Sequence, residues 1–525
     1  MTWIDALSAA ELEARGKAVF RHDGRQYLVL RTAEGIFACT NRCPHEGYPL
    51  SEGVLTEGHV LTCNWHNWKF DLASGETLVG GDKLPHVPVQ VRDGRVWLEI
   101  TPPDPAALRR KVLGALPKAL EDVDQQRLVR EVARLAQIGA DPVDAVRCAV
   151  AWAAERLEFG TTHAIAGAPG WLALYDGAAT VEDEKLAALG EILGHFADDV
   201  RGLERYPFPA GNAPWDEARF LAAVEAEDEP TAVMILRGGL AEGLSPGDLL
   251  PTLVTAALAH YADFGHSLIY TVKTAELARR LGPDSVEPLL LLLVRSLIYA
   301  AREDRLPEFR DYAAHCRAWR RDTLEKAAPL EAEALRGKSA KSVMSLVAAW
   351  GTHYTPEAIF AVLVEAAAWI LLHVDERVLT RVDAALADNV GWLDFTHALT
   401  FADAAQTAVA VRPELWPNAL LQLACFIGRN NGYVDPGLDV RPHTVSDLRD
   451  FLDRRKAALF DHGRDRFIIS VHLVKTLLAG EALMAALSDK APLVASALNR
   501  FLDAPMKGRH VLRTARQMRD LVAQE

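Results

Sequence analysis

The chain has 525 residues, of which 50% are hydrophobic and 24% charged, and its net charge is −14. These values are typical of a globular protein with an ample core and roughly two to four domains. The acidic excess argues against nucleic-acid binding, which needs a basic surface. Few cysteines, and a first segment without the basic start and apolar run of a signal peptide, predict a cytoplasmic protein. The apolar run 289–294 is too short to span a membrane and predicts a buried helix.

Residues 1–100 predict a small all-β domain. Short segments in which apolar and polar residues alternate, such as AVFRHDGRQYLVLRT and VQVRDGRVWLEI, are typical of strands. Three dipeptides between such segments predict hairpin turns: Asp23-Gly24, Glu34-Gly35 and Asp93-Gly94. The proline-rich stretch TPPDPAAL then indicates a linker over residues 101–110.

Residues 111–525 predict a large all-α domain, because Ala- and Leu-rich segments with apolar residues at helical spacing replace the alternating pattern. Asp141 and Thr355 are each followed by a proline, so we expect them to cap helices that begin at that proline. The segments 205–215 and 430–444 interrupt the pattern and predict loops within this domain.

Two motifs in the β-domain carry metal-binding side chains. Cys43-x-His45 and Cys63-x-x-His66 are separated by 17 residues. Two thiolates and two imidazoles suit either structural zinc or a [2Fe–2S] cluster in which histidines replace two cysteines on one iron. A zinc finger commonly pairs cysteine with cysteine and histidine with histidine, whereas each motif here holds one of each. The pattern therefore favours the cluster and leaves zinc as the alternative.

The sequences around these motifs, CPHEGYPLSEG and CNWHNWKFDLASGE, resemble the Rieske family. The resemblance covers residues 1–100. It implies that Cys43 and Cys63 hold one iron of a [2Fe–2S] cluster and that His45 and His66 hold the other. Such a cluster transfers single electrons.

The chain departs from the respiratory Rieske proteins at four positions. Two cysteines that form a disulfide beside the cluster in those proteins are Tyr48 and Trp65 here. A serine and a tyrosine whose hydroxyls donate hydrogen bonds to sulfur are Trp68 and Phe70 here. Since fewer donors leave the reduced cluster less stabilised, we expect a low potential of about −150 mV, as in the ferredoxin and oxygenase types.

The electron acceptor is sought among the downstream histidines. The Asp/Glu-x-x-His-x4-His motif of β-rich Rieske oxygenase domains is absent from the sequence, and His260 and His266 form the only close histidine pair. Six histidines on loops or beside charges are predicted to be solvated: His195, His315, His373, His443, His462 and His510. Four others lie in apolar segments: His163, His266, His397 and His472.

Each of these four could singly be a core histidine, but one iron ion would give all four buried imidazoles a partner. Lys475 lies three residues after His472, on the same predicted helix face and among apolar neighbours. It is either a lysine that extends its ammonium to water or a neutral amine that binds carbon dioxide as a carbamate. Tyr270, Trp392 and Trp171 are candidate pocket walls, although aromatic residues beside apolar helices are more often core.

A second resemblance appears in these segments. In chain order, the segments around the four histidines are similar to those of the questin-oxidase-like family of non-haem iron oxygenases, over residues 145–485. A second histidine in that family's His-Pro-Leu-Ile-His motif is Tyr270 here. The resemblance implies an all-helical fold and a non-haem Fe(II) site. Its implied ligands are His163, His266, His397, His472 and a carboxylated Lys475.

Together the resemblances predict a Rieske-coupled oxygenase. An NAD(P)H-dependent reductase would reduce the cluster, and the helical-domain iron would use O2 to oxidise an organic substrate of aromatic or polyketide-like type. Monooxygenation is favoured, because a dioxygenase that takes all four electrons from its substrate needs no such donor. The two metal sites would meet within one chain or across a homo-oligomer.

Two alternatives stay open. Asp263 and Asp394 precede His266 and His397 in a shared D-F-x-H pattern, which could build a di-iron site in a helical bundle or could orient each histidine. The helical part could also be a docking scaffold in an electron carrier for a separate oxygenase. Iron content separates these readings, at about three per chain for the single-iron site, four for the di-iron site and two for the carrier.

Overall fold

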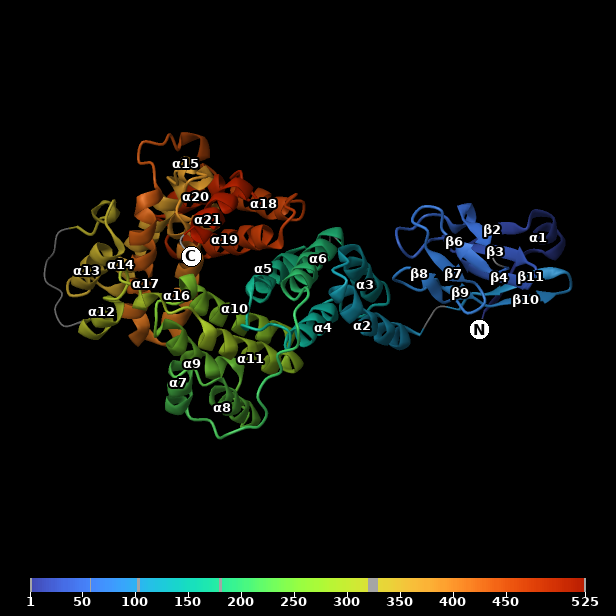
Figure 1. The fold of residues 1–525 in the computed structure, drawn as a ribbon, viewed down its shortest axis with the longest axis horizontal. Coiled ribbons are helices and arrows are strands. Elements are labelled where there is room, and N and C mark those ends of the chain that lie inside the picture. Colours follow the sequence, from blue (N-terminus) through green and yellow to red (C-terminus); the bar gives the residue numbers. More distant parts are fainter. Residues whose placement is uncertain (1, 57, 102–103, 179–181, 320–328, 524–525) are drawn as a thin grey trace. The chain divides into compact units, whose positions relative to one another are not determined.

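The structure, a computed structural model, describes residues 2–56, 58–101, 104–178, 182–319 and 329–523. The chain forms two compact units, Met1–Arg110 and Lys111–Glu525. Sheets make up the first unit and helices the second (Figure 1). The predicted fold class, a small β-domain followed by a large helical one, is confirmed.

Among its described residues, the first unit holds three antiparallel sheets, the α-helix α1 (Ala9–Arg15) and a short 3-10 helix (Leu50–Glu52). Its described strands are β1 (Trp3–Ser8), β2 (Lys17–His22), β3 (Arg25–Thr32), β4 (Gly35–Thr40), β5 (Val54–Thr56), β6 (Val60–Thr62), β7 (Lys69–Asp71), β8 (Thr77–Val79), β9 (His86–Val87), β10 (Val89–Arg92) and β11 (Arg95–Glu99). The sheet orders are β1-β11-β10, β2-β3-β4-β9 and β5-β6-β7-β8. The three predicted hairpins join β2 to β3, β3 to β4 and β10 to β11.

The turn between β2 and β3 shows why the hairpins form. Asp23 and Gly24 both adopt left-handed φ angles, 46° and 73°. Two successive left-handed residues match the twist of the flanking strands, and Asp-Gly tolerates them at low cost. One apolar core of this unit contains Cys43 and Cys63 together with Phe70, so the folded sheets bring the two metal motifs together.

The second unit is helical in all its regular elements that the structure describes. Its helices are α2 (Pro105–Glu121), α3 (Gln125–Gln137), α4 (Asp144–Ala153), α5 (His163–Gly177), α6 (Glu182–Asp199), α7 (Glu217–Glu225), α8 (Glu229–Ala241), α9 (Pro246–Leu258), α10 (His266–Leu281), α11 (Pro283–Tyr299), α12 (Tyr312–Ala318), α13 (Ala340–Trp350), α14 (Pro356–Leu372), α15 (Glu376–Thr380), α16 (Trp392–Val411), α17 (Trp416–Asn430), α18 (Leu448–Leu459), α19 (Phe467–Ala486), α20 (Ala491–Leu502) and α21 (Val511–Val522).

Of the two predicted helix caps, Thr355 is confirmed and Asp141 is not. Thr355 caps α14, and its hydroxyl accepts a hydrogen bond from the backbone N–H of Ala358. The start predicted at Pro142 is wrong, because the Asp141 carboxylate accepts from the backbone N–H of Val143 (3.0 Å) and forms a turn before α4. α2 begins inside the predicted linker, since proline fits the first turn of a helix.

Four helices from distant parts of the chain form a closed ring at the centre of the second unit. α5 packs on α10, α10 on α16, α16 on α19, and α19 on α5. Such a bundle core can hold a metal between side chains of facing helices.

One helix of the ring is unusually apolar. Among the described residues, α19 alone is long and apolar enough to cross a membrane by length and composition, yet 72% of its apolar window is buried inside the fold. Core helices that are apolar all round share this property. α19 carries His472 and Lys475, so both side chains start from a buried helix.

Candidate metal centres

The two cysteine motifs of the first unit lie in loops with the same backbone pattern. The carbonyl of Cys43 accepts a hydrogen bond from Gly47 N (2.9 Å), and that of Cys63 accepts one from Asn67 N (3.0 Å). Gly47 and Asn67 both have left-handed φ angles, 76° and 59°, which glycine and asparagine adopt most readily. The two loops therefore present their ligands as a matched pair.

The ligand atoms of these loops converge. His45 Nδ1 and His66 Nδ1 are 3.1 Å apart, close to the roughly 3.4 Å expected of two nitrogen atoms that each lie about 2.1 Å from one tetrahedral metal. Cys43 and Cys63 are buried, with 3% and 1% of their surface exposed. Burial, aided by the neighbouring Cys63, raises the pKa of Cys43 to about 11. Two buried sulfurs behind two outward imidazoles fit a [2Fe–2S] cluster, whose positive irons would displace the thiol protons.

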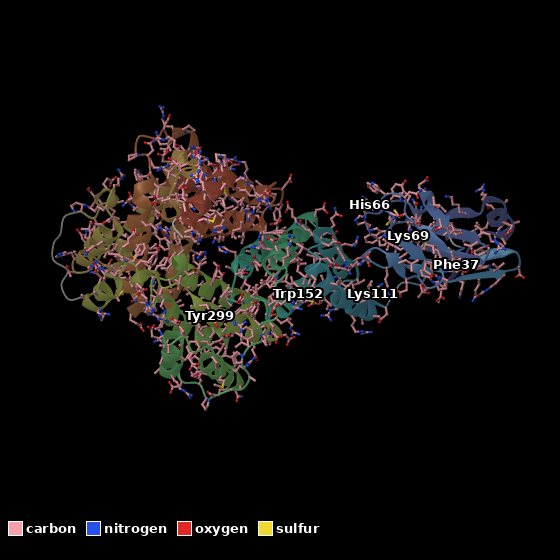
Figure 2. The ribbon with its side chains drawn as sticks, in the orientation of Figure 1. Phe37, His66, Lys69, Lys111, Trp152 and Tyr299 are labelled. Carbon is pink, nitrogen blue, oxygen red and sulfur yellow. The ribbon has the colours of Figure 1, made fainter. Side chains whose placement is uncertain are left out.

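Aromatic rings flank both imidazoles. Trp68 stacks on His45 at 4.6 Å between centroids, and Trp65 stacks on His66 at 5.0 Å. Trp65 is 56% exposed, and Figure 2 labels its neighbour His66 together with Lys69, the first residue of β7. Phe70 packs in the same core as the two cysteines and offers no hydroxyl to them. The sulfur side of the predicted cluster is therefore apolar, as the expected low potential requires. On the histidine side, the Glu46 carboxylate lies 3.9 Å from His66 Nδ1 and 4.0 Å from His45 Nε2.

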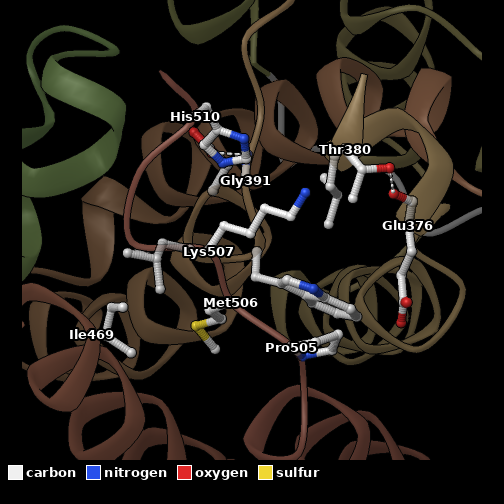
Figure 3. A pocket seen from close by; sticks show the side chains of 12 residues that line it. Glu376, Thr380, Gly391, Ile469, Pro505, Met506, Lys507 and His510 are labelled. Carbon is white, nitrogen blue, oxygen red and sulfur yellow. Dashed lines mark hydrogen bonds between the residues drawn. The ribbon is translucent and has the colours of Figure 1, made fainter. Parts of the chain in front are cut away.

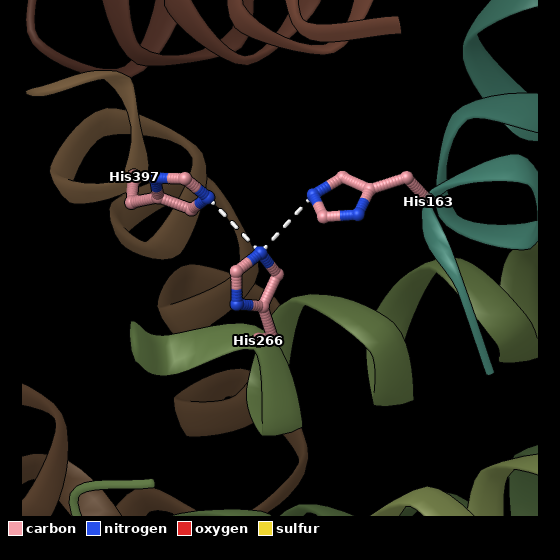
Figure 4. Close-up of side chains that lie close together, drawn as sticks. All are labelled: His163, His266 and His397. Carbon is pink, nitrogen blue, oxygen red and sulfur yellow. Dashed lines mark hydrogen bonds between the residues drawn. The ribbon is translucent and has the colours of Figure 1, made fainter. Parts of the chain in front are cut away.

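The four histidines predicted as iron ligands lie together in the helical ring. His163 and His266 begin α5 and α10, and His397 and His472 lie in the second turn of α16 and α19. His266 Nε2 is 3.1 Å from His163 Nε2 and 3.0 Å from His397 Nε2 (Figure 4). The ring centroid of His472 lies 4.8 Å from that of His163 and 5.2 Å from that of His397. Three of these histidines already form a group that could hold a metal ion.

Lys475 joins this group with an uncompensated amine. Lys475 Nζ and His472 Nε2 are buried and have no hydrogen-bond partner among the described residues. Burial lowers the pKa of Lys475 to about 7. Burial and the Lys475 charge lower the pKa of His266 to about 3, and hold the pKa values of the other three histidines well below their usual range.

These protonation states suit a cation. Neutral imidazoles and a neutral amine present lone pairs, and among the described side chains no carboxylate contacts the Nε2 atoms that face one another. Burying so many unpaired nitrogen atoms is costly without a shared partner. The donor set fits a non-haem iron ion, for which imidazole is a common ligand.

At two of the four histidines a backbone carbonyl holds the Nδ1 atom, so that Nε2 faces inward. His266 Nδ1 lies 2.5 Å from the carbonyl oxygen of Asp263, and His472 Nδ1 lies 2.7 Å from that of Ile468. A histidine that donates from Nδ1 to a carbonyl keeps Nε2 as the lone-pair atom, which is the usual arrangement in metal sites.

The turn before His266 is strained. Asp263, Phe264 and Gly265 have φ angles of 47°, 57° and 74°, a left-handed run that costs about 1–3 kcal/mol for each non-glycine residue. A Cβ on Gly265 would lie 2.7 Å from the Phe426 ring. The strain therefore places the His266 imidazole against the ring of helices at a position that an ordinary helix start would miss.

Two charged residues stabilise this turn, and sequence reasoning missed both. The Glu303 carboxylate accepts a hydrogen bond from Phe264 N (2.9 Å), and the Arg429 guanidinium lies 3.7 Å from the Phe264 ring centroid. Their positions in the sequence are distant from any histidine motif. Only the folded chain brings them to the DFGH segment.

The two aspartates of the D-F-x-H pattern do not join the histidine group. Asp263 Oδ2 is 4.0 Å from His266 Nδ1, and its side chain is 50% exposed. The Asp394 carboxylate accepts a hydrogen bond from Gly391 N (2.6 Å) and so caps the start of α16. The carboxylates that a di-iron site needs are thus engaged or directed elsewhere.

The prediction of solvated histidines is wrong for two residues. His195 is 4% exposed and stacks on Phe467, and His373 is 8% exposed and stacks on Trp369. A charged neighbour in the sequence does not imply exposure, since Asp199 Oδ1 lies 3.5 Å from His195 Nε2 one turn further along α6 while the imidazole stays buried. The other four are partly exposed: His315, His443, His462 and His510.

Tyr270→Phe is expected to weaken metal binding at the helical site about 10- to 100-fold. Tyr270 Oη lies 3.2 Å from His163 Nδ1, where it can accept the proton that an Nε2-ligating imidazole carries on Nδ1. The measurement is Fe(II) titration of the metal-stripped chain against a competing chelator. Tyr175→Phe is the matched control, because Tyr175 lies on α5 like His163 but is not bonded to that imidazole. Equal affinities for the two variants would contradict a role for the Tyr270 hydroxyl.

Comparison with known proteins gives the following. The family model of the Rieske [2Fe-2S] domain matches residues 2–88. The 4beta-methylsterol monooxygenase of Methylococcus capsulatus is 34% identical over 128 residues, 22% of this chain and 34% of that protein. The ferredoxin component of the alkene monooxygenase system of Xanthobacter autotrophicus is 36% identical over 101 residues, 19% of this chain and 83% of that protein. The terminal oxygenase of carbazole 1,9a-dioxygenase from Nocardioides aromaticivorans is 26% identical over 19% of this chain and 31% of that chain, with a TM-score of 0.18.

Proposed function

Because the chain belongs to the Rieske [2Fe–2S] family through residues 2–88, we propose that it is an oxygenase in which a Rieske cluster supplies electrons to an iron in the helical unit. The observation that carries the proposal is the group of four histidines and one buried lysine without a hydrogen-bond partner. These side chains come from four different helices, and among the described residues no acidic side chain contacts the Nε2 atoms that face one another.

The chain's own residues have distinct tasks in this proposal. Cys43, Cys63, His45 and His66 hold the cluster. His163, His266, His397, His472 and Lys475 hold a single Fe(II), with Lys475 as a carbamate. When bound, this iron would supply activation of O2 with electrons from the cluster. The resemblance to the questin-oxidase-like family supports this ligand set.

The proposal also includes an electron donor and a substrate. An NAD(P)H-dependent reductase reduces the cluster in the cytoplasm, and an organic substrate receives oxygen by monooxygenation. His397, His472 and Lys475 are buried and His163 and His266 half-buried, which limits the access of bulk water and protects a reactive site from side reactions. The chain spans about a third of the methylsterol monooxygenase that it resembles, so that protein's substrate does not carry over to this chain.

The second candidate function is an electron carrier for a separate oxygenase. The alkene monooxygenase ferredoxin component favours it, because this chain covers 83% of that carrier's length. Iron analysis of well-loaded, full-length protein separates the two functions. About three irons per chain support the oxygenase, about two support the carrier, and about four support a di-iron site.

Phe70→Tyr is expected to raise the cluster potential by about 20–60 mV, the equivalent of one hydrogen bond of about 0.5–1.5 kcal/mol. Phe70 is fully buried beside the two cysteines, so a hydroxyl added there can donate to sulfur and stabilise the reduced cluster. A redox titration followed by the spectrum of the reduced cluster measures the shift. Phe20→Tyr, packed against the other core of this unit, is the control. An unchanged or lower potential would refute the explanation.

A further inference from the structure

A cavity of about 200 Å³ lies where α16 and α19 begin, closed by α15 and by the segment that follows α20 (Figure 3). Its apolar walls are Leu379, Trp392, Leu393, Ile469, Pro505 and Met506. An apolar cavity of about 150 Å³ holds benzene. This cavity therefore suits a small apolar body of one or two rings, or a short alkyl chain.

The polar groups of the cavity leave it with one uncompensated positive charge. The Glu376 carboxylate accepts from Arg500 (3.3 Å), and the Asp394 carboxylate caps α16. Among the described residues no acid pairs with the Lys507 ammonium, and Figure 3 shows this side chain reaching across the cavity beside His510. Burial and the neighbouring cations lower the pKa of His510, so His510 is a neutral hydrogen-bond donor near neutral pH.

The cavity and the histidine group follow one another along the same helix faces. Leu393 precedes His397 by four residues on α16, and Ile469 precedes His472 by three residues on α19. Residues three or four apart share a helix face and are one turn, about 5.4 Å, apart along the axis. α16 and α19 pack on each other, so their shared seam runs from the cavity to the two histidines.

We propose that this cavity binds the substrate of the helical metal site and that the substrate is a small apolar carboxylic acid. Its carboxylate pairs with Lys507 and accepts a hydrogen bond from His510, while its apolar part lies against the walls and extends along the α16–α19 seam. This inference rests on the proposed oxygenase function, because a substrate that extends along the seam toward His397 and His472 is oxidised only if those histidines hold iron. Apolar walls with few convergent polar groups are the usual composition of a small-molecule site.

Isothermal titration calorimetry of the full-length chain tests the inference with 2-naphthoate and octanoate as acids and 2-naphthamide as the neutral analogue. Lys507→Gln removes the charge at an exposed position, so the fold is expected to persist. Lys341→Gln, at an exposed lysine that pairs with Asp311, is the matched control. Met506→Trp fills the cavity from a segment outside α16 and α19.

The expected result is binding of at least one acid, with a Kd about tenfold higher in Lys507→Gln and unchanged in Lys341→Gln. The amide is expected to bind about tenfold more weakly than 2-naphthoate and to be indifferent to Lys507→Gln, and Met506→Trp abolishes acid binding. Absence of binding by both acids, or equal effects of the two lysine variants, overturns the inference. The proposed function is tested by the iron count instead, so failure of the inference and failure of the proposed function are distinguishable.

Discussion

His397→Ala is expected to lower the iron content of the purified chain from about three atoms to about two and to leave the cluster spectrum unchanged. His397 Nε2 lies 3.0 Å from His266 Nε2, so its loss opens the ligand group on the side of α16. Removing one imidazole also leaves the remaining buried nitrogen atoms without a common partner. Iron analysis and the spectrum of the reduced cluster, measured on the same sample, report the two sites separately.

A matched control distinguishes a lost ligand from a damaged core. His373→Ala also removes a buried imidazole, at the residue that follows α14, but that ring stacks on Trp369 and lies outside the histidine group. We expect this variant to keep about three irons. Reoxidation of the chemically reduced cluster in air should be slower in His397→Ala than in His373→Ala, because the cluster has lost its acceptor. Two irons in the parent chain, with equal reoxidation rates in both variants, would contradict the oxygenase proposal.

Local patterns predicted the first unit well, because its signals lie close together in the sequence. Asp23-Gly24 specifies a hairpin by its own backbone preferences. Each cysteine motif is a loop of a few residues whose Gly47 or Asn67 supplies the left-handed turn. Neighbouring residues determine such features, and no knowledge of distant contacts is needed.

For the helical site, the sequence predicts which histidines are candidate ligands but not the backbone geometry that brings them together. His163, His397 and His472 were identified by apolar surroundings and by resemblance, since neither criterion needs the packing of helices. The strained turn at Phe264 was not, because an αL phenylalanine is disfavoured locally and exists only where distant residues such as Glu303 hold it. Burial of His195 was missed for the same reason, since the face that a helix buries depends on what packs against it.

In the metal-free chain, Lys475 is expected to make the stability depend strongly on pH. Its pKa is lowered by burial from 10.5 to about 7. Below pH 7 both the folded and the unfolded chain bind the proton, and folding bears the full cost of a buried ammonium. Between about pH 7 and 10.5 the folded chain releases the proton while the unfolded chain keeps it, so stability rises with pH over this window.

Lys475→Met is therefore expected to stabilise the metal-free chain by about 4 kcal/mol at pH 7 and to remove the rise above pH 7. Methionine fills a similar volume without a charge to bury. Denaturant unfolding of the metal-stripped chain between pH 6 and 10 measures the effect. Lys273→Met is a suitable control, because that half-buried lysine is paired with Asp403 (3.3 Å) and the chain should lose stability when it is replaced. A parent chain with a flat pH profile would show that the Lys475 amine is not held in an apolar site.

The same shifted pKa makes carbon dioxide a reactant for Lys475. A neutral amine attacks CO2 to form a carbamate and release one proton, which converts an unpartnered Nζ into an anionic oxygen ligand beside four neutral imidazoles. Lys475→Ala should weaken Fe(II) binding about 10- to 100-fold, and acetate or propionate should restore it by occupying the vacated space with a carboxylate. In the parent chain, Fe(II) affinity should rise with bicarbonate, and ¹³CO₂ should give a carbamate carbon signal that Lys475→Ala lacks. If the Fe(II) affinity is independent of bicarbonate and carboxylates do not restore it in Lys475→Ala, the four histidines are the whole ligand set. An amine that neither binds CO2 nor is replaced by a carboxylate contributes no negative charge to the iron.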